Sequence, residues 1–190
     1  GTAARLSAGV ASGTPVVYVA TGEGYGWALA GSAVAARDRA PVLLVAHDRL
    51  PASTAAELRR LQPGRIVVLG GTGSVSRAVA TALDGYTAGS VTRLGSGSRY
   101  STSLSVSRAS YAAGSATTVY LASGTTYSDA LAAASSVGAA GAPVLLVRDD
   151  RATSGLLNEL RRLAPSEVVV VGGSSRIGDV VIDAVSNLAG

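Results

Sequence analysis

The sequence predicts an α/β fold of two tandem three-layer modules, with parallel sheets flanked by helices in a Rossmann-like or Toprim-like arrangement. Short runs of β-branched and other apolar residues alternate with longer helical patterns along the 190 residues. This alternation is typical of parallel strands joined by right-handed helical crossovers. The later part of the chain also repeats the earlier part at a constant interval of 102 residues. An interval of that length is the size of a small domain and is too long for a solenoid repeat.

Four pairs of matching segments carry the repeat. They are Val-Tyr-Val-Ala-Thr-Gly at 17–22 with Val-Tyr-Leu-Ala-Ser-Gly at 119–124, Ala-Pro-Val-Leu-Leu-Val at 40–45 and 142–147, Leu-Arg-Arg-Leu at 58–61 and 160–163, and Val-Val-Leu-Gly-Gly at 67–71 with Val-Val-Val-Gly-Gly at 169–173. We place the module boundary in the Gly- and Ser-rich segment 90–101. The first module is then residues 1–90 and the second, complete module is residues 91–190.

The two modules are not expected to be equal copies. The segment Arg-Leu-Ser-Ala-Gly at 5–9 resembles Arg-Leu-Gly-Ser-Gly at 93–97, but it lies much closer to the strand that follows. The first module is therefore expected to lack about one helix. It is either a degenerate copy or a module that another subunit completes.

Each module contains three expected strands, because three short apolar runs in each are bounded by Gly, Pro or polar residues. Continuous rather than alternating apolar runs indicate a parallel sheet that is buried on both faces. The expected strands are Val16–Ala20, Val42–Ala46 and Ile66–Leu69, and then Val119–Ala122, Val144–Arg148 and Val168–Val171.

Helical patterns separate these strands. Ser53 or Thr54 is the candidate N-cap of the second helix, through a capping-box sequence, and Pro63 and Pro165 end the helices before them. The expected helices are Tyr25–Arg39, Ser53–Leu61, Val75–Leu83, Thr102–Ala113, Tyr127–Ala140, Ser154–Leu163 and Ile177–Leu188.

The composition argues against several classes of function. The chain has no Cys and a single His, His47, so it predicts no disulfide, no Cys or multi-His metal site and no spaced Ser/His/Asp set. We expect no cofactor, no metal and no catalytic residue. All 16 basic residues are Arg, the net charge is +4, and the Arg residues are scattered, so nucleic acid is not an expected partner. No apolar run reaches 18 residues, so membrane insertion is not expected either.

Four segments resemble the cell wall-binding type 2 repeats. Residues 93–103 (Arg-Leu-Gly-Ser-Gly-Ser-Arg-Tyr-Ser-Thr-Ser) resemble that family's R-L-x-G-x-x-R-Y-x-T-A segment, and residues 123–131 (Ser-Gly-Thr-Thr-Tyr-Ser-Asp-Ala-Leu) resemble its A-[ST]-G-x-x-[FY]-[PS]-D-A-L segment. Residues 142–146 resemble its A-P-[IV]-L-L strand, and residues 169–173 its V-x-V-[LIV]-G-G strand and turn. The resemblance is strong in the second module and partial in the first, where Gly26-Trp27 stands in place of Ser128-Asp129.

This resemblance implies a noncatalytic repeat of exported Gram-positive proteins, at the cell wall or cell surface. The Ala-, Gly-, Val-, Ser- and Arg-rich composition is what a GC-rich genome, such as an actinobacterial one, produces. The implied partner is an anionic cell wall polysaccharide or a teichoic-acid-like polymer. Because family members commonly carry three repeats and this chain has two, we also expect a homo-oligomer. The implied polymer-binding residues are Arg5, Arg93, Arg99, Tyr100, Thr102, Ser123 and Asp129.

Each of these residues also has a purely structural interpretation. Arg99 could pair with a phosphate or carboxylate while Tyr100 stacks on a sugar, or Arg99 could cap a helix end with Tyr100 half in the core. Asp129 could complement a helix N-terminus or form an ion pair that shapes a groove. The repeated pairs Arg59-Arg60 and Arg161-Arg162 could be a solvated helix face or a basic patch.

The Gly-rich turns at 70–74 and 172–175 follow strands and precede helices, where α/β folds hold phosphates. They lack the P-loop pattern, so we interpret them as tight turns, with an anionic polymer phosphate as the alternative. Trp27 is interpreted as a packing or interface residue. Two other functions stay open: a self-assembling structural surface subunit (an oligomer, layer or filament), and a small-ligand enzyme with a doubly wound fold.

Overall fold

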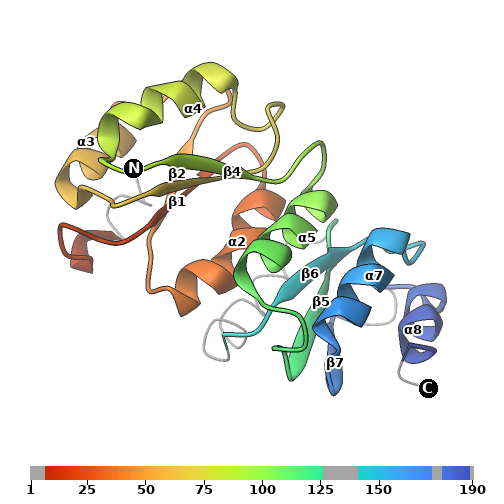
Figure 1. The fold of residues 1–190 in the computed structure, drawn as a ribbon. Helices are drawn as coiled ribbons and strands as arrows, with labels where there is room; N and C mark the ends of the chain where they lie inside the picture. The colour runs from red at the N-terminus through yellow and green to blue at the C-terminus, as the bar shows by residue number, and fades with distance from the viewer. Residues whose placement is uncertain (1–6, 126–140, 173–176, 189–190) are drawn as a thin grey trace.

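Two parallel sheets with a shared layer of helices between them make up the fold (Figure 1). The computed structural model describes residues 7–125, 141–172 and 177–188. Strands and helices alternate along the chain, and every pairing between the described strands is parallel. The predicted α/β class, with parallel sheets flanked by helices, is therefore confirmed.

The first sheet has the strand order β2-β1-β3-β4. Its strands are β1 (Val17–Thr21), β2 (Val42–Val45), β3 (Ile66–Leu69) and β4 (Val91–Leu94). The central strands β1 and β3 are buried along their whole length, as expected where helices cover both faces of a sheet. The register places Ile66 beside Val91 and Leu69 beside Leu94.

The second sheet has the order β6-β5-β7 among the described residues. Its strands are β5 (Thr118–Ser123), β6 (Val144–Val147) and β7 (Glu167–Val171). Val119 of β5 pairs with Val168 of β7, and the next residue, Tyr120, pairs with Val144 of β6. The three strands repeat the order β2-β1-β3 of the first sheet, and the counterpart of β4 does not occur among them.

Helices cover the outer face of each sheet. Over the first sheet lie α3 (Ala52–Leu61) and α4 (Arg77–Leu83), with a short 3-10 turn η2 (Asp84–Tyr86) after α4. Over the second sheet lie α7 (Ser154–Leu163) and α8 (Asp179–Ser186). The helix expected over Tyr127–Ala140 lies outside the described residues.

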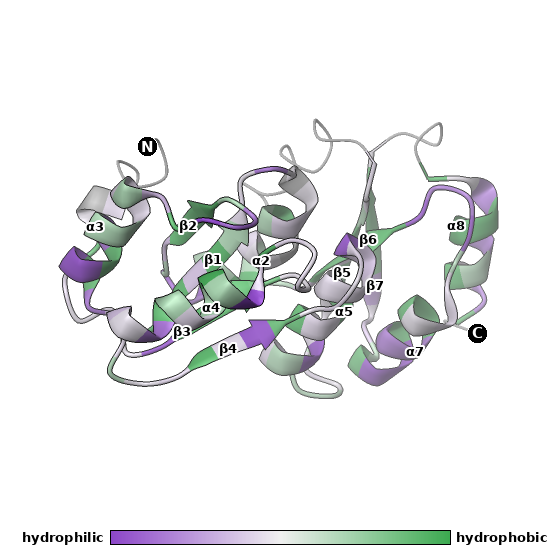
Figure 2. Ribbon diagram, turned by 90° about the horizontal axis from the view of Figure 1, so that it is seen from above, coloured by the Kyte–Doolittle hydropathy of each residue, from purple (hydrophilic) through white to green (hydrophobic). Residues whose placement is uncertain are grey.

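The helices α2 (Tyr25–Arg37) and α5 (Arg99–Ser110) fill the space between the sheets, as Figures 1 and 2 show from two directions. On one side, Val34 of α2 and Val106 of α5 pack against Tyr18 and Leu69 of the first sheet. On the other side, Ala33 of α2 packs against strands of the second sheet. The two modules therefore share this middle layer instead of each having its own.

The segment 90–101, in which the module boundary was placed, contains strand β4 and the start of α5. The helix expected over Thr102–Ala113 is corrected, because α5 begins earlier, at Arg99. Ser98 is its N-cap: the Ser98 hydroxyl accepts a hydrogen bond from the Ser101 N–H, and the Ser98 N–H donates one to the Ser101 hydroxyl. The strand was missed because Val91–Leu94 is short and carries two polar side chains.

The cap expected for α3 is also corrected. Pro51, and not Ser53 or Thr54, is the N-cap residue, so both hydroxyl residues lie in the first turn of the helix. The Thr54 hydroxyl donates instead to the Leu44 carbonyl at 2.7 Å and ties the helix to β2. The ends expected before Pro63 and Pro165 are confirmed, because α3 stops at Leu61 and α7 at Leu163.

The 3-10 turn η1 (Ser7–Gly9) of the first repeat corresponds to the end of α5 in the second repeat, and not to residues 95–97. The Ser7 hydroxyl donates to Glu57 at 2.7 Å, and the Ser107 hydroxyl donates to Glu159, the residue 102 positions after Glu57, at 2.6 Å. The match of residues 5–9 to 93–97 is thus wrong for Ser7. Arg5 itself lies outside the described residues. The division at residue 90 stays a prediction, although β4, beyond it in sequence, belongs to the first sheet.

Candidate functional site

The helices α2 and α5 lie side by side and run in the same direction. At their starts, a Cβ built on Gly26 would come within 2.9 Å of the Arg99 side chain. At their ends, Arg37 donates to the Ser110 carbonyl at 2.6 Å, and its guanidinium lies 4.9 Å from the centroid of the Tyr111 ring. Both N-termini therefore point to the same edge of the molecule.

The carboxyl ends of both sheets meet at this edge. The turn after β3 touches the start of α5, because a Cβ on Gly71 would lie 2.8 Å from the Gly97 nitrogen. Across the middle layer, Arg99 Nη1 donates to the carbonyl of Gly124, the residue after β5, at 2.5 Å. We call this region the shared carboxyl edge: the first turns of α2 and α5 with the turns that follow β1, β3, β5 and β6. Two helix N-termini give it a positive backbone potential.

Arg93 lies at the end of β4, at this edge, and its guanidinium is committed to backbone carbonyls. Nη1 donates to Gly70 at 2.8 Å and Nη2 to Ser76 at 3.4 Å. Burial, and then the positive charge of Arg77, lower the pKa of Arg93. Arg93 therefore fixes the turn after β3, which is the structural role, and it brings a second positive charge close to Arg77.

A groove beside Arg77 and Arg93 opens along the outside of β4. Its volume is about 460 Å³. Three hydroxyl side chains, those of Thr72, Thr81 and Thr92, line it together with one carboxylate, Asp84. Arg77 is exposed. The groove thus offers hydrogen-bond donors and two guanidinium groups to an anionic or hydroxylated ligand.

Tyr100 lies across the middle layer from this groove, with its ring between two parts of the second sheet. The Arg148 guanidinium lies 5.0 Å from the ring centroid, a cation–π distance. The other part is Gly124, where any side chain would overlap the ring. Tyr100 is half-buried against Ala122 and Leu146. The structure therefore brings Arg99, Tyr100 and Arg148 together. Arg99 and Tyr100 each also make contacts that stabilise the fold.

Ser123 belongs to a polar cluster that sequence reasoning found only in part. Its hydroxyl donates to Asp149 Oδ1 at 2.6 Å, and Thr125 donates to the other carboxylate oxygen. The Thr125 N–H closes the turn on the Ser123 hydroxyl at 3.1 Å. Asp149 was not selected in the sequence. Its position two residues past the end of β6, beside the end of β5 in a parallel sheet, was the signal available.

The first module has a different group at the same place. His47 corresponds to Asp149, and its backbone N–H donates to Glu23 at 3.3 Å while its ring Nε2 lies 3.2 Å from the Thr72 carbonyl. The first module therefore has an imidazole where the second has a carboxylate, at equivalent positions of the shared carboxyl edge. His47 is half-buried and bridges two turns, so it is more than a surface loop residue.

The remaining residues singled out in the sequence either pack in the interior or lie outside the described residues. Thr102 is wholly buried, and its hydroxyl donates to the Ser98 carbonyl at 3.0 Å within α5. It packs against Gly95, whose φ of 107° and lack of space both require glycine. Asp129 and Arg5 lie outside the described residues. Trp27 is half-buried in the core beside Gly70, as a packing residue.

The repeated Arg pairs on α3 and α7 do not form a free basic patch. Arg60 pairs with Glu57 at 2.6 Å, and Arg162 pairs with Glu159 at 2.6 Å. Each also donates to a backbone carbonyl outside its helix, that of Val10 for Arg60 and that of Tyr111 for Arg162. The glutamates were missed. An i, i+3 Glu–Arg pair that recurs after 102 residues was the available signal.

Two further features concern membranes and metals. None of the described helices is both long and apolar enough for a membrane crossing. No cluster of three or more metal-ligating side chains occurs in the described part of the chain. What the shared carboxyl edge offers is guanidinium groups, hydroxyl groups and helix N-termini, which suit recognition of an anion.

Comparison with known proteins identifies the fold. Cwp6 from Clostridium difficile matches 98% of this chain with 29% sequence identity and a TM-score of 0.88. Cwp8 from Clostridium difficile matches 98% with 22% identity and a TM-score of 0.86. The chain spans 30% of the length of Cwp6 and 32% of the length of Cwp8. No curated protein sequence matches it.

The family model of Cell wall binding domain 2 (CWB2) matches residues 1–80 and 93–182, which together make up most of the chain. The interval between the two matches contains η2 and the start of β4. The resemblance seen in the sequence motifs is therefore confirmed over both repeats. The chain belongs to the Cell wall binding domain 2 family, a family of cell wall binding modules.

Proposed function

We propose that this chain is a noncatalytic module that anchors an exported protein to the cell wall by binding an anionic secondary wall polymer at the shared carboxyl edge. The observation that supports the proposal is the convergence of basic side chains with two helix N-termini at that edge. Arg77, Arg99 and Arg148 would meet the negative groups of the polymer, while Arg93 holds the turn beside them.

Charge and geometry support an extended ligand more than a small one. The Arg77 groove and the Tyr100–Arg148 pair lie on different sheets, with the starts of α2 and α5 between them. A polymer with repeated phosphates or carboxylates can reach both places at once, whereas a single small anion cannot. Weak binding at each place then adds up through effective concentration.

Asp149 makes the charge of the shared carboxyl edge uneven. Its carboxylate accepts hydrogen bonds from Ser123 and Thr125, and its negative charge repels anions from the turn that these two residues form. We therefore place the negative groups of the polymer toward Arg77 and Arg148. Sugar hydroxyls would lie nearer to Asp149, because a carboxylate is a strong hydrogen-bond acceptor.

Pelleting with Gram-positive wall sacculi tests the proposal. The sacculi are used intact or after acid extraction of their anionic polymer, at low and at high salt. The chain should pellet with intact walls, much less with extracted walls, and less at high salt, because exposed charges are screened. The variants Arg77→Ala and Arg148→Ala should each weaken pelleting by roughly three- to tenfold, the range expected for one charged contact.

Arg161→Ala is the matched control, because it removes the same charge from an exposed site at the opposite end of α7, far from the carboxyl edge. Equal loss with all three variants would mean that only net charge matters. Equal pelleting on intact and extracted walls would sink the polymer mechanism. Arg99→Ala is less informative alone, since it also removes the bond to Gly124.

Self-assembly into a structural surface layer or filament is the alternative function. The unpaired outer edge of β7 among the described strands is the observation that favours contact between chains. Light scattering at rising protein concentration would show a growing mass if this function is right. A constant monomer mass, together with polymer-dependent pelleting, would decide for anchoring.

A further inference from the structure

The outer edges of β3 and β7 are equivalent positions in the two repeats, but among the described strands only the edge of β3 has a partner. In the first sheet, β4 pairs along β3 from Ile66 to Leu69. In the second sheet, β7 pairs with β5 on one side, and no described strand pairs with its other side. The first repeat therefore shows, in the same molecule, what this type of edge accepts.

Burial differs between the repeats in the way that an unoccupied edge would produce. Ile66 and Leu83 are 0% exposed in the first repeat. Their counterparts 102 positions later are Val168, which is half-buried, and Val185, which is 9% exposed. Every residue of β3 is buried, whereas no residue of β7 is. Smaller side chains account for part of this difference, but not for the partial exposure of all four valines of β7.

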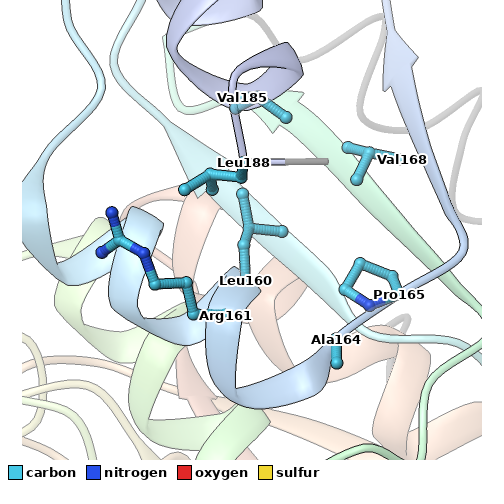
Figure 3. Close-up of a pocket in the computed structure, with 7 residues that line it drawn as sticks. All are labelled: Leu160, Arg161, Ala164, Pro165, Val168, Val185 and Leu188. Atoms are coloured by element: carbon cyan, nitrogen blue, oxygen red, sulfur yellow. The ribbon is translucent and has the colours of Figure 1, made fainter. Parts of the chain in front are cut away.

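A cavity lies beside the open edge (Figure 3). Its volume is about 240 Å³. Figure 3 shows Val168 facing it from β7, with Leu160 from α7, Val185 from α8 and Leu188 from the turn after α8 around it. The first repeat has a groove of about 670 Å³ at the counterpart place, but Ile66 and Leu83, the counterparts of Val168 and Val185, do not line it. Tyr86 and Val91 pack against the core there. Val91 is the first residue of β4 and lies beside Ile66.

Polar contacts hold the segment that leads into β4, and the residues that this segment contacts have counterparts in the second repeat. The Thr87 hydroxyl donates to the Pro63 carbonyl at 2.8 Å, and Arg59 stacks on the Tyr86 ring at 5.2 Å. The corresponding residues, Pro165 and Arg161, line the cavity. The Ile66 and Gly70 N–H groups donate to the Ser90 and Leu94 carbonyls, which makes the Val168 and Gly172 N–H groups the expected donors at the open edge.

We propose that the outer edge of β7 and the cavity beside it form an acceptor site for an extended polypeptide segment, which joins the second sheet as a fourth, parallel strand. The segment has the chemistry of residues 89–94: two small residues that lead in, then a β-branched residue that lies opposite Val168, as Val91 lies opposite Ile66, and covers the Val168 wall of the cavity. Backbone hydrogen bonds hold the strand, and the cavity selects its first apolar side chain.

The test supplies such a strand in cis. By the interval of 102, Gly190 corresponds to Ala88, so a tail with the sequence of residues 89–95 (Gly-Ser-Val-Thr-Arg-Leu-Gly) is added after Gly190 in the full chain. Amide hydrogen exchange at Val168 and Gly172 should slow by about tenfold or more. The midpoint of thermal unfolding should rise by about 2–4 °C.

The control tail carries proline in place of its Thr and Leu, which removes two backbone donors while keeping the length. Exchange at Ile66 and Gly70 should not change with either tail. Equal effects of the two tails, or no slowing at Val168 and Gly172, would overturn the proposal. Dimerisation by light scattering, with slowed exchange in the chain that has no tail, would show instead that a second copy occupies the edge.

Discussion

At the scale of single residues, the two buried glutamates are the most informative groups. Glu159 has no exposed side-chain surface, and its oxygens accept hydrogen bonds from Ser107, Arg108 and Arg162. Burial alone would raise the pKa of Glu159, but these hydrogen bonds outweigh it and lower the pKa. For Glu57, the hydrogen bond from Arg60 is the largest cause of a lowered pKa.

The change Glu159→Gln should lower the free energy of unfolding by about 2–3 kcal/mol, because an amide replaces the buried carboxylate that accepts hydrogen bonds from Arg108 and Arg162. Urea denaturation at pH 7 measures the loss. Glu57→Gln is the matched control, and it should cost less because the Glu57 side chain is 10% exposed and pairs with a single Arg. An equal or larger loss for Glu57→Gln would contradict this account.

The same two glutamates should also set the acid sensitivity of the fold. A carboxyl group whose pKa is lowered on folding binds fewer protons in the native state than in the unfolded state, so stability rises with pH across this range. The free energy of unfolding should therefore be level above about pH 5.5 and fall as the pH drops below the ordinary glutamate value. Glu159→Gln should flatten this fall when unfolding is followed from pH 7 to pH 3.

At the scale of elements, α3 and α7 end in the same strained way. Gln62 and Ala164 follow the last helical residues in the left-handed conformation, with φ of 44° and 46°. This conformation favours glycine, because a Cβ costs about 1 kcal/mol there. Pro63 and Pro165 then prevent the helices from continuing.

The change Ala164→Gly should raise the free energy of unfolding by about 0.5–1 kcal/mol by removing that strain. The control is Ala184→Gly inside α8, where the backbone is helical and glycine should cost about 1 kcal/mol. Thermal or urea unfolding of both variants gives the comparison. If both substitutions destabilise the protein equally, the left-handed strain at Ala164 is not significant.

The elements that the sequence predicted well are those whose pattern is local. The helix Ser154–Leu163 was predicted to the residue, because its apolar positions repeat with helical spacing and Pro165 follows. Strand β4 was missed because a short edge strand with exposed Thr92 has no apolar run of its own; only pairing with β3 reveals it. For the candidate site, Arg99, Tyr100 and Ser123 came from a motif. Arg77 and Arg148 could not, because they come to one edge only when both sheets share one layer of helices. Asp149 was signalled only by its position after β6.

At the scale of the whole molecule, the shared middle layer makes the two repeats depend on each other. Strand β4 and the helix α5 follow residue 90 in the sequence but complete the first sheet and its inner face. In turn, α2 from the first repeat covers part of the second sheet. Neither half keeps its apolar surface buried when it is alone.

Separate production of residues 1–90 and 91–190 should therefore give two polypeptides without cooperative unfolding or a native near-ultraviolet circular dichroism signal. The intact chain should unfold in one transition, because loss of the middle layer exposes both sheets. Differential scanning calorimetry of the three polypeptides tests this. Two independently folded halves with sharp transitions would restore the interpretation of tandem, self-sufficient modules.

The middle layer also affects how this protein can diverge in evolution. From Gly26 to Ala35, no described position of α2 is exposed, and the same is true of α5 from Arg99 to Ser107. In contrast, α3 and α7 keep one face in solvent, where substitutions are nearly neutral. Among relatives, residue variation should therefore follow a helical period along α3 and α7 but stay low around the whole circumference of α2 and α5. Small residues such as Gly31 and Ala33 should tolerate no larger replacement unless the opposite sheet changes with them.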